Sequence, residues 1–323
     1  MKSPPDGRPS GSLDSQLEET LTTLLAAGAP GAAALAVGPW GRVHSAAGLD
    51  SSGRPWQATA RFDVGSITKT FVATLVLALV EEEKLGLDDE ARMHLPARFE
   101  SVGAVTMRSL LNHTSGLPDF FEDAAFVAKW QEEGSGRLWD PEDLIAISLG
   151  LPPHDPGSFS YANSNYVLAG LVIESVAGRP IGELLRNRIL DPLGLTATQL
   201  PATANAAGGL VSTADELARF LAALFAGQIV SETSFREMLT TVPSDWAESQ
   251  AYGLGIEAVE SLMGFEASPC GAAWGHVGLG EATSVAFTTP DASRQVVLMA
   301  NAMVISDAAW SALNRATWAV LCS

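Results

Sequence analysis

The spacing of apolar positions changes from helical to alternating within the first fifty residues. Residues 13–27 carry apolar side chains at helical intervals with acidic residues on the opposite face, and Ala-Pro-Gly at 29–31 ends this pattern. Residues 32–37 and 42–47 have the composition of two strands, and Gly-Pro-Trp-Gly at 38–41 is typical of the turn between them. We therefore predict a helix followed by a β-hairpin.

The remainder of the chain divides into a helical middle and a β-rich end. Residues 66–224 show helix and loop patterns, and residues 71–80 form an apolar run too short for a membrane span, which predicts a buried core helix. Strands are predicted at 252–258, 272–277, 283–288 and 295–300, followed by a closing helix at 308–321. The order predicts an α+β fold, in which an antiparallel sheet from both chain ends is flanked by helices and a helical region is inserted between them.

Charge narrows the range of partners. The 323 residues include 19 basic and 37 acidic side chains, a net charge of -18. Such a chain repels phosphate backbones and anionic membrane surfaces, so we expect neither nucleic acid nor a membrane as partner. The oligomeric state is left open.

Residues 1–12 and the two cysteines bear on the compartment. Residues 1–12 are rich in Pro and Gly and lack an apolar run, so we predict a disordered tail and no secretory signal in this chain. This favours a cytoplasmic protein, with an exported protein whose signal was trimmed as the alternative. Cys270 and Cys322 have no neighbours at metal-ligand spacing, so no metal site is expected. They are either two buried thiols, as in a cytosolic protein, or one bridge, as in an exported one.

The first candidate for chemistry is Ser66-Ile-Thr-Lys69, at the start of the apolar helix. Residues three apart share a helix face, so the hydroxyl and the amine lie within reach of each other. Burial and the helix N-terminus lower the pKa of the Lys69 amine, as a general base for a serine nucleophile requires. The alternative is a capping serine and a solvated lysine. Only four lysines occur in the chain, and one inside an apolar segment favours the catalytic interpretation.

The second candidate is Tyr161-Ala-Asn163, which follows a loop rich in Pro and Gly. A phenol and a carboxamide two residues apart can both face a cleft, where one relays a proton and the other binds a substrate carbonyl. Alternatively, Tyr161 is a core aromatic and Asn163 caps the next helix.

The third candidate is His276 on a predicted strand, with Gly275 and Gly278 around it. Glycines allow a second backbone or a substrate to approach the strand closely, and the strand edge could then supply an N–H to an oxyanion hole. The alternative is a half-buried histidine at a bend in a sheet.

In this order, Ser66-Ile-Thr-Lys69, Tyr161-Ala-Asn163 and His276-Val-Gly278 resemble the three signature motifs of the penicillin-recognising serine enzymes. The nearest branch is similar to class C β-lactamases, D-alanyl-D-alanine carboxypeptidases and related esterases. The resemblance extends from about residue 13 to residue 322.

The resemblance implies a β-lactamase/transpeptidase-like fold. It comprises an α/β domain from residues 13–65 and 208–323, a mainly helical domain from residues 66–207, and an active site in the cleft between them. Acyl transfer through Ser66 needs no metal or organic cofactor. The implied roles are Ser66 as nucleophile, Lys69 and Tyr161 as proton-transfer groups in an undecided order, Asn163, His276, Val277 and Gly278 as substrate-binding residues, and the backbone N–H groups of Ser66 and Leu279 as oxyanion hole.

The departures from the family pattern concern the substrate. Val277 and Leu279 are apolar where relatives that take a terminal carboxylate carry hydroxyl or basic residues, and Glu257 and Glu260 stand where an arginine would help. Because a desolvated carboxylate without a cation is costly, we predict a serine hydrolase or acyltransferase that acts on an ester, an amide or a D-amino-acid peptide whose leaving group has no free carboxylate. The alternatives are a D-alanyl-D-alanine carboxypeptidase, a class C-like β-lactamase, or a non-catalytic module that binds penicillin or a peptide.

Overall fold

The computed structural model describes residues 12–50, 52–133, 139–246, 250–303 and 306–323. The predicted tail lies outside these residues apart from Ser12, which begins the first helix.

The elements follow the predicted order of sheet, helices and sheet. In the described residues the strands are β1 Gly31–Gly38, β2 Gly41–Gly48, β3 Phe62–Asp63, β4 Val211–Ser212, β5 Val242–Pro243, β6 Gln250–Tyr252, β7 Glu257–Val259, β8 Ala273–Leu279, β9 Thr283–Thr288 and β10 Gln295–Ala300. The α-helices are α1 Ser12–Ala26, α2 Thr68–Glu81, α3 Met107–Leu111, α4 Ala124–Glu133, α5 Pro141–Leu149, α6 Asn163–Ala177, α7 Ile181–Leu185, α8 Ala214–Phe225, α9 Glu232–Met238 and α10 Asp307–Leu321. Short 3-10 turns include η1 Gly65–Ile67 and η4 Phe120–Glu122.

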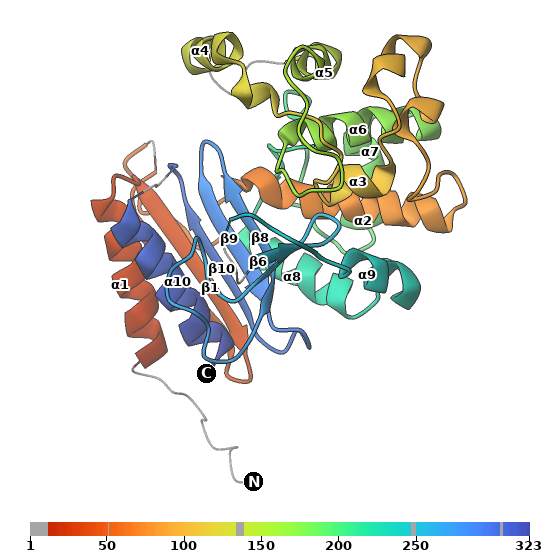
Figure 1. Cartoon of the computed structure of the whole chain (residues 1–323). Coiled ribbons are helices and arrows are strands. Elements are labelled where there is room, and N and C mark those ends of the chain that lie inside the picture. The colour runs from red at the N-terminus through yellow and green to blue at the C-terminus, as the bar shows by residue number, and fades with distance from the viewer. Residues whose placement is uncertain (1–11, 51, 134–138, 247–249, 304–305) are drawn as a thin grey trace.

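The main sheet joins the two ends of the chain. Its strand order is β2-β1-β10-β9-β8-β7-β6-β5, and every neighbouring pair is antiparallel. In the sheet of the described residues, β1 of the N-terminal hairpin pairs with β10 of the C-terminal strands, where Ala32 is opposite Ala300. The red and blue strands therefore lie side by side in Figure 1.

The two faces of the sheet pack into separate cores because side chains alternate along a strand. Ala32, Ala34 and Ala36 of β1 face α1 and α10, which lie side by side over one face of the sheet (Figure 1). Ala33 and Leu35 face the other core, to which α2, α6 and α8 contribute. The small alanines of β1 leave room for helices on both sides. These observations confirm the predicted α+β class.

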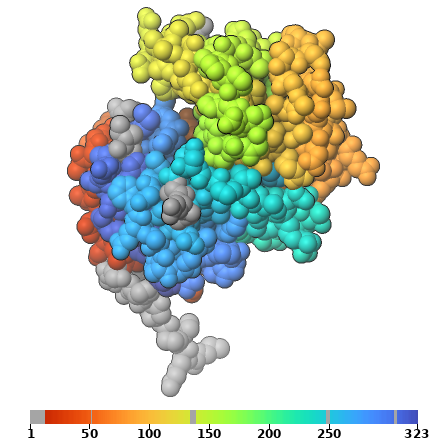
Figure 2. All heavy atoms as spheres, in the orientation of Figure 1, coloured from red at the N-terminus to blue at the C-terminus, as the bar shows by residue number. Residues whose placement is uncertain are grey.

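The helical part is built around α2. Its run Thr-Lys-Thr-Phe-Val-Ala-Thr-Leu-Val-Leu-Ala-Leu is buried almost throughout, as predicted for the apolar segment 71–80. Figure 2 shows the yellow and green helical segments above the red and blue segments of the two chain ends. No helix in the described ranges has the length and apolarity needed to cross a bilayer. The exact domain boundaries at residues 65 and 207 stay a prediction.

The expected strand at 252–258 is wrong as a single element. It divides into β6 and β7, because Gly253 N donates to Ile256 O at 2.8 Å and closes a turn. Gly255 in this turn has a φ of 70°, and a Cβ there would lie 2.7 Å from the Lys69 carbonyl oxygen. The turn therefore packs directly on α2, a contact that strand periodicity does not reveal.

A second difference is the small sheet β3-β4. Val211–Ser212 pairs with Phe62–Asp63, within a segment where only helix and loop were expected. Each strand is two residues long, so neither produces an alternating pattern. This pairing holds the segment before Ser66 next to the chain at residue 211.

The cysteine alternatives resolve in favour of the bridge. Cys270 and Cys322 form a disulfide with their Cα atoms 5.6 Å apart. It ties the end of α10 to the connection between β7 and β8.

Candidate active site

Ser66 lies in η1, between the sheet and the start of α2. Gly65 before it has a φ of 52°, and a Cβ at this position would lie 2.8 Å from Leu279 N of β8. Gly278 is equally close on the other side, since its Cβ would lie 2.0 Å from Val64 O and 3.3 Å from Ser66 N. Two glycines thus allow β8 to approach the backbone of the candidate nucleophile.

Three of the predicted site residues meet at the Ser66 hydroxyl. Lys69 Nζ lies 2.9 Å from Ser66 Oγ, and Tyr161 Oη donates to Ser66 Oγ at 2.8 Å. Lys69 is one helical turn after Ser66, whereas Tyr161 enters from the loop before α6. The geometry assembles a hydroxyl, an amine and a phenol in direct contact.

Lys69 is fully buried, and its amine has two more partners. Nζ donates to Asn163 Oδ1 at 2.8 Å and to Ala207 O at 2.7 Å. Burial lowers the pKa of the Lys69 amine to about 7, although the negative charges of Asp119 and Glu257 act in the opposite direction. The amine is therefore close to half neutral near neutral pH, as a general base there requires.

Burial shifts the pKa of Tyr161 in the opposite direction to that of Lys69. Burial raises the pKa of its phenol well above the usual value, and the hydrogen bond to Ser66 only partly offsets this effect. Its ring packs against His113 and Trp246, with centroid distances of 4.2 and 5.0 Å. The phenol is thus a neutral proton donor held between aromatic rings.

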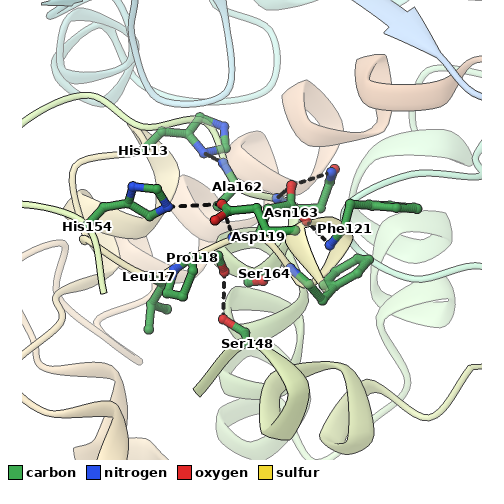
Figure 3. A network of polar contacts seen from close by, with 12 residues as sticks. His113, Leu117, Pro118, Asp119, Phe121, Ser148, His154, Ala162, Asn163 and Ser164 are labelled. Atoms are coloured by element: carbon green, nitrogen blue, oxygen red, sulfur yellow. Dashed lines mark hydrogen bonds and ion pairs between the residues drawn. The ribbon is translucent and has the colours of Figure 1, made fainter. Parts of the chain in front are cut away.

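Asp119 is a part of the site that the sequence analysis missed. Its Oδ2 accepts from both Asn163 N and Asn163 Nδ2 at 2.8 Å, and its Oδ1 accepts from Phe121 N (Figure 3). These contacts turn the Asn163 carboxamide so that Oδ1 faces Lys69. The available signal was the capping box of Asp119 and Glu122 at the start of η4.

Asn163 is the first residue of α6, and Ala162 is the N-cap. Both ends of its carboxamide are engaged, Oδ1 by Lys69 and Nδ2 by Asp119. The expected role of Asn163 in substrate binding stays a prediction. Its observed role is to connect Asp119 to the lysine.

β8 forms the opposite wall of the site. His276 is 2% exposed, so it is more buried than the half-buried alternative supposed, and its Nε2 lies 2.7 Å from Tyr252 Oη. Its Nδ1 lies 2.9 Å from Glu257 Oε1, which also accepts from Val277 N at 3.1 Å. The predicted residues of the third motif are therefore brought to the site, together with a carboxylate from β7.

These groups border one cavity of about 900 Å³. One part of its lining is aromatic and aliphatic: Phe120, Phe121, Phe126, Trp130, Trp139 and Leu144. Another part contains Ser66, Tyr161 and Asn163 with the β8 residues His276, Val277 and Leu279. Within the described ranges, His, Cys, Asp and Glu side chains form no group of three or more that could hold a metal ion. The arrangement can carry out nucleophilic acyl transfer with proton relay.

The comparisons with known proteins agree with this geometry. The family model "Beta-lactamase" matches residues 17–316. A D-stereospecific amidohydrolase from Streptomyces sp. is 32% identical, with a TM-score of 0.80 over 92% of this chain and 97% of that one. D-Amino acid amidase from Ochrobactrum anthropi SV3, in complex with L-phenylalanine, has a TM-score of 0.78 at 24% identity over 95% and 97% of the two chains, a likeness of fold. The putative penicillin-binding protein PbpX of Bacillus subtilis (strain 168) is 28% identical over 60% of this chain and 53% of its own length.

The chain belongs to the beta-lactamase family, as the resemblance of its motifs indicated. Within this family it has the fold of β-lactamases and penicillin-binding proteins, and its similarity to amidases supports a serine hydrolase in the general sense. It spans about half the length of the curated relative PbpX, and about a third of penicillin-binding protein 4* of the same organism, which is 33% identical over 46% of this chain.

Proposed function

We propose that this protein hydrolyses amides or esters of amino acids, with preference for the D-configuration, through a covalent acyl intermediate on Ser66. The observation that carries the proposal is the direct contact of Ser66 Oγ with both the Lys69 amine and the Tyr161 phenol at the wall of the cavity. A non-catalytic binding module would not require all three groups in contact.

The two proton-transfer groups take different roles because burial changes their pKa in ways that suit opposite tasks. Lys69, with a pKa of about 7, accepts the Ser66 proton as Oγ attacks the substrate carbonyl carbon. Tyr161 stays protonated and donates to the leaving nitrogen or oxygen as its bond to the carbonyl carbon breaks. The Lys69 ammonium then returns the proton to the phenolate. Water then attacks the acyl carbon with Lys69 again as base, and the Lys69 ammonium protonates Ser66 Oγ as the bond from Oγ to the acyl carbon breaks and the acid leaves.

The oxyanion of the tetrahedral intermediate would be bound by the backbone N–H groups of Ser66 and Leu279. Support comes from the close approach of β8 to η1, for which Gly65 and Gly278 are both required. Such a pair of backbone donors contributes about 10²–10³ in rate per donor in other serine hydrolases.

The substrate class follows from the cavity. Six aromatic or aliphatic side chains form an apolar region suited to a large apolar substituent, such as the aromatic group of phenylalanine. Carboxylates predominate among the charged lining residues, with Asp63, Glu257 and Glu281 against Arg61, which favours amine-bearing over acidic substrates. The similarity to the D-stereospecific amidohydrolase supports the D-configuration.

The test is acyl-enzyme capture on the intact protein. Wild type, Ser66→Ala and Ser101→Ala are each treated with a fluorophosphonate, benzylpenicillin, and esters of D- and L-phenylalanine, and their masses are measured. Ser101 is a matched control because it is exposed in a 3-10 turn at residues 97–102. We expect adducts on wild type and Ser101→Ala alone, with the D-ester acylating faster than penicillin.

Two results would contradict the proposal in different ways. Adducts on Ser66→Ala would exclude Ser66 as the nucleophile. Fast, long-lived acylation by penicillin with slow reaction of the D-ester would instead favour a carboxypeptidase or a β-lactamase, as the penicillin-binding relatives suggest.

A further inference from the structure

The open edge of β8 is partly occupied by the protein itself. β7 pairs with β8 only from Ala273 to Gly275, and beyond Gly275 no described strand pairs with this edge. Alternate residues direct their N–H groups to one edge, so the N–H groups of Val277 and Leu279 face the cavity side. They are two residues apart, a spacing of about 7 Å along a strand.

Glu257 occupies one of these two positions. Its Oε1 accepts from Val277 N at 3.1 Å and lies 2.9 Å from His276 Nδ1. A backbone N–H and a histidine are the partners that a substrate carboxylate would need at this edge, and here the protein's own carboxylate takes them.

The described contacts of Glu257 use one of its two carboxylate oxygens. The side chain is 5% exposed and lines the cavity, and its ion pair and its hydrogen bond in the described ranges both involve Oε1. Gln250 adds a second acceptor nearby, because its Nε2 donates to Ser261 O while its buried Oε1 lacks a partner in the part of the chain described. A buried acceptor without a partner, such as Gln250 Oε1, calls for a donor from a ligand.

Glu257 lies close enough to the reacting groups for its charge to act on them. Its charge affects the pKa of Lys69 and also that of Tyr161, the phenol that donates to the leaving group in the proposed reaction. The buried cation Lys69 makes its hydrogen bonds to Ser66, Asn163 and Ala207 and not to Glu257. Glu257 lines the same cavity as Ser66 and Tyr161, and it contacts the β8 edge at Val277, where relatives that take a terminal carboxylate carry a hydroxyl or basic residue.

The geometry points to Glu257 as a specificity residue that gives the site a cation-accepting subsite for the leaving group. This inference rests on the proposed function and extends it. A leaving group with an ammonium gains a charged hydrogen bond to Oε2, and a neutral leaving group is tolerated. A leaving group with a carboxylate is repelled by the charge of Glu257, which already accepts from the donors that this carboxylate would need.

The experiment compares three amides of one acyl group. The D-phenylalanyl amides of 1,2-diaminoethane, glycinamide and glycine place an ammonium, a neutral amide or a carboxylate at similar distances from the scissile bond. We expect kcat/KM to be at least 10²-fold higher for the ammonium than for the carboxylate in wild type. In Glu257→Gln, which keeps the acceptor for Val277 N, the ratio of ammonium to carboxylate amide should fall below tenfold, each rate being taken relative to that of the neutral amide with the same variant.

Glu260→Gln is the matched control. It removes the same charge three residues further along the chain from an exposed side chain, so it should leave the wild-type ratio unchanged. Equal loss of preference in both variants would overturn the inference, because it would show that only the net charge matters. A further comparison uses substrates whose acyl α-amine is acetylated. If Glu257→Gln changes the effect of this acetylation on kcat/KM and not the preference among leaving groups, the assignment to the leaving group is wrong.

Binding to Ser66→Ala distinguishes failure of this inference from failure of the proposed function. Calorimetric titration with the three amides requires no turnover, and tighter binding of the ammonium than of the carboxylate compound would support the subsite. Equal dissociation constants would overturn it. Turnover of the amides without any preference would leave the proposed hydrolysis intact and reject only the role of Glu257.

Discussion

Gly278 offers the sharpest test of the close approach between β8 and Ser66. A Cβ at residue 278 would lie 2.0 Å from Val64 O, and real Cβ atoms essentially never come closer than 3.0 Å to another heavy atom. Gly278→Ala must therefore separate β8 from the segment before Ser66 by about 1 Å. Because the contacting atom is the backbone carbonyl oxygen of Val64, no side-chain rotation can relieve the contact.

The displacement separates the two proposed oxyanion donors, Ser66 N and Leu279 N. A shift of 1 Å in a catalytic group can cost about 10²-fold, and loss of one oxyanion donor costs about 10²–10³-fold, or roughly 3–4 kcal/mol of transition-state stabilisation. We expect kcat/KM for the best ester to fall at least 10²-fold in Gly278→Ala. The free energy of unfolding should fall by only about 1–3 kcal/mol, as for other overpacked sites.

The assay measures kcat/KM together with the melting temperature, and Gly280→Ala serves as the control. A Cβ at Gly280 meets no atom within 4 Å, so this variant should retain wild-type activity. If Gly278→Ala is folded and within threefold of wild type in kcat/KM, the proposed oxyanion hole is refuted.

Three other predictions use the same protein preparation. Because Lys69 must be neutral to accept a proton and its pKa is about 7, kcat/KM should rise through a midpoint near pH 7 and fall tenfold per unit well below it; a flat profile from pH 5 to 8 would exclude Lys69 as the base. Asp119→Asn removes a charge that raises the Lys69 pKa and loosens Asn163, so this midpoint should move to lower pH while kcat decreases; an unchanged profile would contradict the coupling. Replacing Cys270 and Cys322 by serine should lower the free energy of unfolding by roughly 4 kcal/mol, given the separation of 52 residues, and a reductant should destabilise wild type but not this variant in urea titrations.

Two fully buried strands were predictable from the sequence. β9 and β10 occupy the expected residues 283–288 and 295–300, because each is a continuous apolar segment with clear turn residues around it. The break between β6 and β7 was not predictable, since it depends on the packing of Gly255 against α2, far away in the sequence. Local periodicity carries no information about such contacts.

The candidate site shows the same division between local and distant information. The Ser66 and Lys69 pair follows from helical spacing, whereas the contact with Tyr161 spans 95 residues and was expected only through the family resemblance. The Ala207 carbonyl that holds Lys69 is a backbone group, and any residue type can supply it. Asp119 had a local capping signal, but nothing in the sequence indicates that its carboxylate reaches Asn163.

The place of β10 in the sheet has a consequence for synthesis of the protein. Because β10 lies between β1 and β9, a chain still emerging from the ribosome cannot join its N-terminal hairpin to the strands that carry His276 and Leu279. Ser66 and Lys69 are made early, but the wall opposite them is joined to the N-terminal hairpin only when residues 295–300 have left the exit tunnel. A chain that stops before residue 295 therefore lacks the strand that joins the N-terminal hairpin to the wall opposite Ser66.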